Sequence, residues 1–448
     1  MTLPRYQELK DSGIDYLGAI PSTWSIKRLG DIVSFAQGKA HEPYIDDDGD
    51  YICVNSRFVS TAGKTLKKCT VNLTPASLND ILMVMSDLPN GRALARAYYV
   101  RDNGKYAVNQ RVCRITAEKA DSSFLFYLLD RHPGLMQNDD GVHQTHLSND
   151  DFLKLKLYLP SFSEQIQIAR FLDHETARID ALIAEQQRLI ELLKEKRQAV
   201  ISHAVTKGLD PAAPMKHSGV EWLGEVPAHW RAVRLRHCLV DALTYGANEP
   251  SDEANLEHPR YIRITDLNDD GTLSAETYKS LPPEKAEPYM LEEGDVLFAR
   301  SGATVGKSFL YSREYGPACY AGYLIRARVN KRALIPMYLW MCTQSRQYEQ
   351  FIGESNIQAT IQNVSAEKYG NMWIALPEIE EQEKILAELE IQLSQFKSLM
   401  ETSVGALVLL QERRSALISA AVTGKIDVRG WQPPFSTQAP ESAVAEAH

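Results

Sequence analysis

This chain of 448 residues carries few of the features that mark secreted, metal-binding or membrane proteins. Its six cysteines are scattered and form no C-x-x-C pair, which is typical of reduced thiols and argues against a disulfide framework or a zinc site. No stretch approaches the roughly 18 consecutive apolar residues of a membrane span, and the first residues contain no apolar signal core. We therefore expect a soluble, cytoplasmic protein of two or more domains, without a bound metal.

An overall excess of positive charge is also missing, since the net charge is −9. This balance argues against DNA binding by the whole surface, because neutralising phosphates requires clustered Lys and Arg. Basic residues nevertheless gather in two places. Residues 51–116 hold ten basic and three acidic residues, a balance of +7, and residues 296–332 hold seven basic and one acidic residue, a balance of +6. The predicted basic surface is therefore local and occurs twice.

The stretch GATVGKS, at 302–308, resembles a phosphate-binding loop. That motif needs four residues between its first glycine and the Gly-Lys pair, whereas three stand between Gly302 and Gly306. The first half of the chain has SDLPNGR at the matching place, which could not cradle a nucleotide. We expect no ATP binding, and instead a glycine loop that lets backbone N–H groups and Lys307 or Arg92 approach a DNA phosphate.

Other catalytic motifs are incomplete. The segment QPPF, at 432–435, differs by one residue from the Asn/Asp-Pro-Pro-aromatic signature of amino-methyltransferases, but no glycine-rich cofactor loop follows an early strand. His143 and His146 form an H-x-x-H pair without a third ligand nearby, so hydrogen bonding fits them better than metal binding. A stand-alone nuclease would need a convincing acidic cluster beside a strand and a lysine. We expect no catalytic residues and no cofactor bound by this chain.

A long amphipathic helix is predicted at 164–206 and again, diverged, at 381–423. Each copy would be about 65 Å long and needs a partner. One such helix could lie on its own domain, but two copies favour antiparallel packing as an intramolecular spacer. The apolar seam of the first copy is Ile168, Leu172, Ile179, Leu182, Leu189, Leu193 and Val200. An offset of 217 gives the second seam, Ile385, Leu389, Phe396, Leu399, Ala406, Leu410 and Leu417.

The helices also share their ends. They begin with LPSFSEQ and LPEIEEQ, where Ser161 and Glu164 could form a capping box, and they stop at Gly208 and Gly424. A second repeat, at 12–29 and 218–235 with an offset of 206, is rich in Pro and Gly and carries Trp24 as a large apolar anchor. We interpret it as a connector pinned to a neighbouring surface. The tail from Gly430 is rich in Pro, Ser and Ala, and we expect it to be disordered.

Between connector and helix, each half holds short β-rich runs with turn signals, typical of a mixed α/β domain. The predicted strands are 51–54, 81–85, 97–100 and 111–115 in the first half and 261–264, 296–299, 308–311 and 323–329 in the second. A short helix at 124–130 matches one at 337–343. Asp80 and Ser86 correspond to Asp295 and Ser301 at an offset of 215, whereas the loops between them share little. One scaffold therefore carries two different surfaces.

Polar and basic residues just outside the predicted strands are candidates for DNA contact, because Arg, Asn, Gln, Ser and Thr are the side chains that bind base edges. The first-half candidates are Asn55, Arg57, Arg92, Asn109, Gln110, Arg111, His143, Gln144, Thr145 and His146. Those of the second half are Arg263, Ser301, Thr304, Lys307, Tyr320, Arg326, Gln358, Thr360, Gln362 and Asn363.

Together these features resemble the specificity subunit of type I restriction-modification enzymes. The resemblance reaches to about Val428 and rests on YLGAIPSTW and WLGEVPAHW, on GDVLFARSGATVGK, and on the two helices with LP…EQ…ISxAVT. The first half departs from the pattern at SDLPNGR. The resemblance implies an α+β chain with a pseudo-twofold internal repeat, in which two mixed α/β target-recognition domains are joined by two long antiparallel coiled-coil helices. The implied parts are connector 1–30, recognition domain 31–160, helix 161–208, connector 209–235, recognition domain 236–377, helix 378–425 and tail 426–448.

The same resemblance implies that each recognition domain binds one half of a bipartite, asymmetric site in double-stranded DNA. The helices would set the gap and dock two modification subunits, which methylate adenine with S-adenosylmethionine. Motor-nuclease subunits that use ATP and Mg would join them. The alternative is a coiled-coil adaptor that binds proteins only, and neutralising Lys307, Arg326 and Arg328 should separate the two, because DNA affinity and its salt dependence fall only if DNA is bound.

Overall fold

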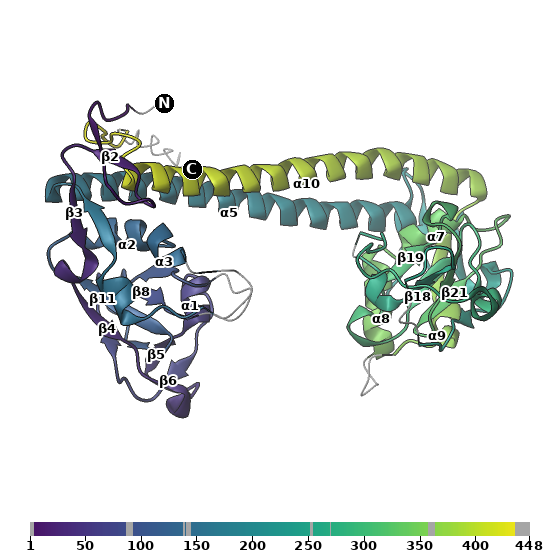
Figure 1. Cartoon of the computed structure of the whole chain (residues 1–448). Helices are drawn as coiled ribbons and strands as arrows, with labels where there is room; N and C mark the ends of the chain where they lie inside the picture. Colours follow the sequence, from purple (N-terminus) through teal and green to yellow (C-terminus); the bar gives the residue numbers. More distant parts are fainter. Residues whose placement is uncertain are drawn as a thin grey trace, which may run out of the picture. The chain divides into compact units, whose positions relative to one another are not determined.

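The computed structural model describes residues 4–86, 93–137, 139, 145–250, 254–268, 270–356 and 363–434. The chain forms two compact units (Figure 1). Unit 1 comprises residues 1–185 and 406–448, and unit 2 comprises residues 186–405. Among the described residues, no helix is both long enough and apolar enough to span a membrane. All six cysteines are buried as free thiols, as their spacing predicted.

The two long helices are α5 (Phe162–Lys207) and α10 (Ile379–Val422), within two residues of their predicted bounds. The other elements of unit 1 are β1 (Leu9–Asp11), β2 (Ala19–Pro21), β3 (Ser25–Arg28), β4 (Val33–Gln37), β5 (Tyr51–Val54), α1 (Ser56–Ser60), β6 (Lys68–Cys69), β7 (Pro75–Ala76), β8 (Ile81–Val84), β9 (Ala97–Tyr99), β10 (Tyr106–Val108), β11 (Val112–Ala117), α2 (Ser122–Leu129), α3 (Pro133–Met136), α4 (Asn149–Leu153) and β12 (Lys156–Leu159).

Unit 2 repeats much of this order. Its elements are β13 (Met215–His217), β14 (Glu225–Pro227), β15 (Arg231–Arg234), β16 (Thr244–Tyr245), β17 (Arg260–Ile262), α6 (Pro283–Ala286), β18 (Val296–Ala299), β19 (Ser308–Leu310), β20 (Ala318–Tyr320), β21 (Leu324–Ala327), α7 (Pro336–Cys342), α8 (Arg346–Asn356), α9 (Ala366–Gly370) and β22 (Trp373–Leu376).

Each unit is built on a four-stranded antiparallel sheet, ordered β4-β11-β8-β9 in unit 1 and β16-β21-β18-β19 in unit 2. A parallel pair stands beside each, β5 with β10 and β17 with β20. The central strand β8 is buried on both faces: Ile81 and Met83 join one core, and Leu82 and Val84 another. Because successive side chains of a strand point to opposite faces, the sheet lies between two apolar layers.

The long helices pack on each other within each unit (Figure 1). In unit 1, Leu172 shares a core with Ala421, and the guanidinium of Arg414 pairs with the carboxylate of Asp180 at 2.8 Å. As α5 advances from 172 to 180, its partner recedes from 421 to 414, so the two segments run antiparallel. In unit 2, Ile201 and Val205 share a core with Ile385 and Leu389.

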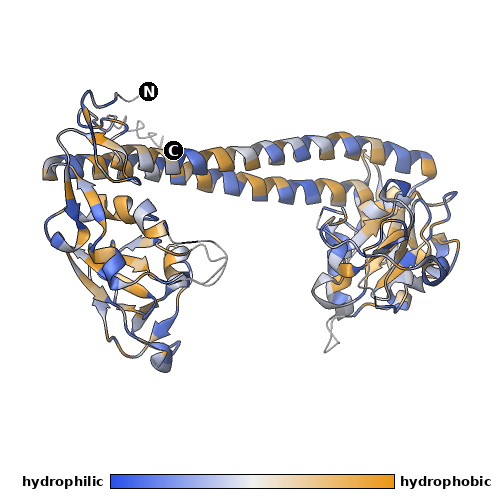
Figure 2. Ribbon diagram, viewed as in Figure 1, coloured by the Kyte–Doolittle hydropathy of each residue, from blue (hydrophilic) through white to orange (hydrophobic). Residues whose placement is uncertain are grey.

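The apolar seam is buried at its ends and exposed in its middle. Ile168, Leu172, Ile179 and Leu193 are buried on α5, as are Ile385 and Leu389 on α10, whereas Phe396, Leu410 and Leu417 are half-buried. Leu182, Leu189 and Leu399 are exposed, and hydrophobic residues recur along both helices in Figure 2. The sequence placed Leu182, Leu189 and Leu399 in the apolar seam, but the structure leaves them exposed, because two helices that pack only on each other bury a narrow strip.

The start of each long helix is tied to its own unit by a buried glutamine. Gln165 donates to the carbonyl oxygen of Pro160 at 3.0 Å and accepts from the backbone N–H of Asp121, which precedes α2. Gln382 makes the same two bonds, to the carbonyl oxygen of Pro377 and from the N–H of Ile335 before α7. The shared LP…EQ motif is thereby explained: its proline and glutamine join a long helix to the helix beside it.

The predicted capping box is only half formed. The backbone N–H of Glu164 donates to the Ser161 hydroxyl at 3.4 Å, so the serine does cap α5. The Glu164 carboxylate, however, accepts from the Tyr6 hydroxyl at 2.6 Å and from Nε1 of Trp24 at 3.1 Å. The carboxylate bonds these two side chains rather than the backbone N–H of Ser161, because buried donors without access to water need an acceptor within the protein.

The connectors are anchored as predicted. Trp24 and Trp230 are fully buried, one in each unit. A side chain added at Gly424 would meet Pro21 and Trp24, and one added at Gly208 would meet Trp230. Both glycines have φ near +70°, so each combines a helix stop with space for a tryptophan.

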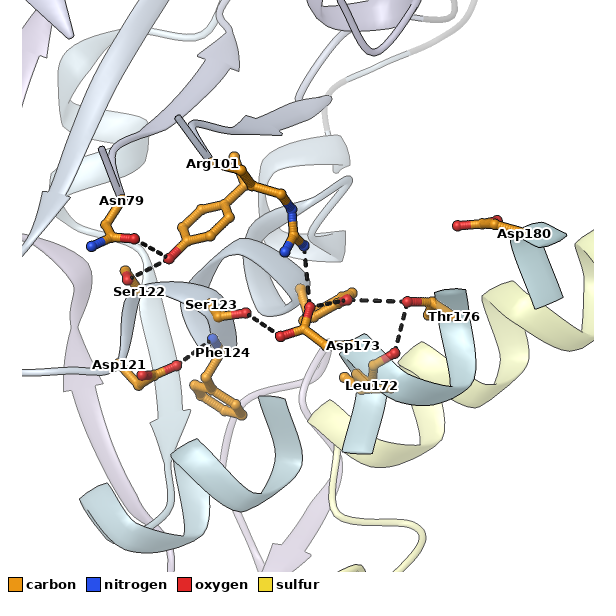
Figure 3. A network of polar contacts seen from close by, with 12 residues as sticks. Asn79, Arg101, Asp121, Ser122, Ser123, Phe124, Leu172, Asp173, Thr176 and Asp180 are labelled. Carbon is orange, nitrogen blue, oxygen red and sulfur yellow. Dashed lines mark hydrogen bonds and ion pairs between the residues drawn. The ribbon is translucent and has the colours of Figure 1, made fainter. Parts of the chain in front are cut away.

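In unit 1, a polar network joins Arg101 and the helix α2 to α5 (Figure 3). The carboxylate of Asp173 accepts from the Tyr127 hydroxyl at 2.8 Å, from Nη2 of Arg101 at 3.1 Å and from the Ser123 hydroxyl at 3.3 Å. Tyr127 also lies 3.1 Å from the Thr176 hydroxyl, one turn further along the helix. Arg101 therefore pairs with a carboxylate of α5, although its side chain is 58 % exposed.

The residues after α10 are more ordered than predicted. Val428 is fully buried, and the Trp431 ring packs edge-on against Phe171 at 5.2 Å. Gln167 donates to the carbonyl oxygens of both Val428 and Trp431. The backbone N–H of Asp427 donates to the carbonyl oxygen of Pro4 at 2.8 Å. The expected disordered tail 426–448 is thus corrected at 426–431, where an apolar ring and two backbone carbonyls find partners on α5.

Candidate nucleic-acid interface

In both units, a residue just after the central strand pairs with a segment from later in the chain. The central strands are β8 in unit 1 and β18 in unit 2. In unit 1, Ser86 forms a β-bridge with His146, and the N–H of Leu147 donates to the carbonyl oxygen of Met85 at 2.7 Å. In unit 2, Ser301 forms the matching bridge with Asn363, and the N–H of Val364 donates to the carbonyl oxygen of Arg300 at 2.8 Å. The framework is shared, whereas the side chains it presents differ.

The glycine loop of unit 2 does not have the form of a nucleotide cradle. Gly302, at φ +74°, begins a single 3-10 turn with open space around its Cα, and β19 follows at Ser308. A phosphate-binding loop would instead open an α-helix. The ammonium of Lys307 donates to the carbonyl oxygen of Leu267 at 3.4 Å, and the Thr304 hydroxyl donates to that of Ser301. Ser301, Thr304 and Lys307 are half-buried at the edge of this open loop.

Most of the described unit 1 candidates reach solvent. Arg57, Gln110, Arg111 and His146 are exposed and Thr145 is half-buried. Asn55 has a further role, because its side-chain oxygen accepts from the N–H of Phe58 at 2.9 Å and caps α1. Six candidates lie outside the described residues: Arg92, His143, Gln144, Gln358, Thr360 and Gln362.

Asn109 and Tyr320 are corrected, because neither side chain is placed to meet DNA. Asn109 is only 6 % exposed; its amide donates to the carboxylate of Glu42 and accepts from the N–H of His41. Tyr320 is 1 % exposed, its hydroxyl lies 2.7 Å from that of Thr244, and burial raises its pKa. Asn109 follows β10 and Tyr320 ends β20, two strands that were not predicted, and their polar atoms hold neighbouring loops together.

Two arginines of unit 2 are engaged by buried carboxylates, Arg328 of the second basic stretch and Arg263, which lies outside it. Arg328 makes a two-pronged contact with Asp295, 2.8 Å at each nitrogen, and hydrogen bonding to that carboxylate raises the pKa of the arginine. Arg263 donates to Asp266 at 3.0 Å and to the carbonyl oxygen of Thr277 at 2.7 Å. Asp295 and Asp266 are fully buried. These arginines stabilise the fold, so the excess of positive charge that faces solvent is smaller than a count suggests.

Three residues in unit 2 complete the described site. Asn363 is exposed and Arg326 is half-buried, and its enclosed Nε has no partner among the residues that the structure describes. Sequence reasoning missed Arg300, whose guanidinium lies over the ring of Tyr245, 4.7 Å from its centroid. Its position directly after the predicted strand 296–299 was the available signal. The partner ring comes from β16, a two-residue strand that the sequence pattern did not reveal.

The sequence matches the family described as Type I restriction modification DNA specificity domain over residues 21–192 and 247–402. It is 26% identical over 341 residues to the type I restriction enzyme EcoBI specificity subunit of Escherichia coli, covering 72% of this chain and 70% of the relative. It is 22% identical over 421 residues to the MjaVIII specificity subunit of Methanocaldococcus jannaschii, covering 92% and 94%.

A solved structure shares the fold. A chain from a study of complex assembly and conformational transition in a type I restriction-modification system superposes with a TM-score of 0.68 at 18% identity, covering 91% of this chain and 99% of the other. The family match covers both halves of the chain, and the relatives align over most of their length. The protein therefore belongs to the family of type I restriction-modification DNA specificity subunits.

Proposed function

We propose that each recognition block, 31–160 in unit 1 and 236–377 in unit 2, reads one half of a bipartite, asymmetric DNA site. The observation that carries this proposal is the repeated β-bridge, Ser86 with His146 and Ser301 with Asn363, which offers different side chains on one framework. Two unlike readers carried on one chain would recognise two unlike half-sites. The other contact candidates of both units remain part of the proposal, apart from Asn109 and Tyr320.

Specificity subunits of type I restriction enzymes are not themselves catalytic, and catalysis lies in partner subunits. In our proposal α5 and α10 set the gap between half-sites and dock two methyltransferase subunits. Leu182, Leu189 and Leu399 support this docking role, because exposed apolar residues on a helix are typical of interaction surfaces. S-adenosylmethionine would then be bound by the methyltransferase subunit, and ATP and Mg by the motor-nuclease subunit, with none held by this chain.

The test is a genome-wide map of methylated adenines with this gene intact and deleted. We expect one gapped, two-part motif to lose methylation on deletion. Replacing block 236–377 with that of another specificity subunit should change one half-motif, and inserting one helical turn into both α5 and α10 should change only the gap. Altered half-motifs after the insertion would contradict the proposal that the blocks read the half-sites and the helices set only the gap.

The alternative is a protein-binding adaptor, which the exposed helix residues and the net charge of −9 would also allow. Substituting Gln for Lys307 and Arg326, in the chain assembled with its modification subunits, separates the two functions. We expect weaker DNA binding and a salt slope reduced by about two, since each lost phosphate contact removes roughly 0.9. Arg328 is left unchanged because it pairs with Asp295. Substituting Gln for Arg313 and Lys331 is the charge-matched control, and equal slopes for both variants would favour the adaptor.

A further inference from the structure

Arg300 is held by three separate segments of unit 2. Its backbone N–H donates to the carbonyl oxygen of Tyr323 at 3.0 Å, and its own carbonyl oxygen accepts from Val364. Its guanidinium lies over the Tyr245 ring, and its Nε donates to the side-chain oxygen of Asn363 at 3.4 Å. The Tyr245 hydroxyl accepts in turn from the N–H of Ala366 at 3.0 Å, so the ring that supports the guanidinium is itself fixed.

This arrangement leaves the outer edge of the guanidinium available. Stacking uses the face of the group and the Asn363 bond uses Nε. Within the described part of the chain, neither terminal nitrogen of Arg300 has an acceptor and no carboxylate pairs with it, in contrast to Arg328 and Arg263. Tyr245 is 40 % exposed and Asn363 is exposed, so the edge opens to solvent beside the loop at Gly302. A positive, planar fork is thus held in place by Tyr245 and Asn363, and among the described residues its two terminal nitrogens have no acceptor.

We propose that Arg300 reads a guanine in the half-site of unit 2, with its two terminal nitrogens donating to O6 and N7 in the major groove. An arginine paired bidentately with guanine is the commonest specific contact to a base edge, and it needs the plane of the guanidinium to be defined. Arginine can also bind a phosphate bidentately, but a phosphate can be approached through several of its oxygens, whereas the guanine edge requires the guanidinium to lie in the plane of the base. The stack on Tyr245 therefore favours the base edge.

At the position that matches Arg300, unit 1 has no arginine. The residue that matches Arg300 at the offset of 215 is Met85, which is fully buried in the core of unit 1. The residue just before the shared β-bridge is therefore a cation, Arg300, in unit 2 and a buried apolar residue, Met85, in unit 1. We expect the guanine contact in only one half-site, which gives the bipartite site part of its asymmetry.

The inference rests on the proposed function and is tested in the chain assembled with its modification subunits. Arg300→Lys and Arg300→Gln are compared with the wild type by methylation motif and by affinity for duplexes that carry each base at each position. We expect discrimination at one guanine of the unit 2 half-motif to fall by roughly 5- to 150-fold, with the other positions unchanged. Tyr245→Ala should relax the same position while keeping the arginine, whereas Tyr245→Phe should retain recognition.

The controls separate a reading role from other roles. Arg313→Gln, at another turn of unit 2, should leave the motif intact, and thermal unfolding should show that the Arg300 variants remain folded. A uniform loss of affinity for all sequences with a smaller salt slope would identify a phosphate contact and overturn the inference, as would an unchanged motif. A wild-type complex without any sequence preference would instead overturn the proposed function, and this inference with it.

Discussion

Replacing Arg328 with Met should lower the free energy of unfolding by about 3–5 kcal/mol, because it leaves a buried carboxylate without its partner. Asp295 is 1 % exposed and accepts two bonds of 2.8 Å from this arginine. Methionine matches the apolar stem of the arginine side chain as far as Nε, and it lacks the charged group beyond it. The loss should therefore report the unpaired charge rather than a cavity. Chemical denaturation of the full chain measures it.

A matched control lies two residues earlier, on β21, which ends at Ala327 just before Arg328. Arg326→Met removes a half-buried arginine for which no carboxylate partner is seen among the described residues, and it should cost much less. Adding Asp295→Asn to the Arg328 variant should restore part of the stability. The neutral amide can still accept from the N–H of Glu292, which now bonds Asp295 at 2.8 Å. An Arg328 variant as stable as the Arg326 variant would show that the buried pair contributes nothing.

Trp24→Ala should destabilise unit 1 by about 3–5 kcal/mol, the usual cost of removing a large buried aromatic side chain. The indole is fully buried, packs 5.7 Å from the Tyr158 ring and 5.8 Å from the Tyr6 ring, and donates to Glu164. Its removal would open a cavity between the connector, strand β12 and the start of α5. Thermal and chemical unfolding of the full chain provide the measurement.

Trp24→Phe divides this loss into packing and hydrogen bonding. The phenyl ring fills most of the space but cannot donate, and the Glu164 carboxylate keeps its 2.6 Å bond from Tyr6. We expect this variant to lose about 1.5–3 kcal/mol, the value of one hydrogen bond to a charged group. Equal losses for the alanine and phenylalanine variants would mean that the anchor acts through its N–H group alone.

The framework was predictable from sequence because its signals are local and repeated. Strands 51–54 and 296–299 were predicted with their exact bounds, since each is an apolar run bordered by turn residues. The turn aspartates Asp80 and Asp295 could be aligned through the offset of 215. In the structure each accepts from the backbone N–H three residues before it, at 2.7 and 2.8 Å. A repeat of this kind lets one half of a chain support the interpretation of the other.

The contact surface was less predictable, because local pattern does not report what lies across the fold. Asn109 looks like an exposed polar residue after a strand, yet Glu42 and His41 approach it from elsewhere and bury it. Arg300 looks ordinary in sequence, and only the ring of Tyr245 beneath it distinguishes it from a solvated arginine. Glu164 was assigned to its own helix, whereas Tyr6 and Trp24 bind it. In each case a partner distant in sequence decides the role.

The bond from the Asp427 N–H to the carbonyl oxygen of Pro4 joins two residues that the internal repeat maps to one place. The connector offset of 206 carries Pro4 to position 210, and the helix offset of 217 carries Asp427 to the same position. In unit 2 the chain passes through Asp210, so peptide bonds join the end of α5 to the connector that follows it. In unit 1 the corresponding residues, Pro4 and Asp427, are far apart in sequence and are joined by this hydrogen bond instead. The repeat therefore has two corresponding junctions between connector and long helix, one of them covalent and the other a hydrogen bond.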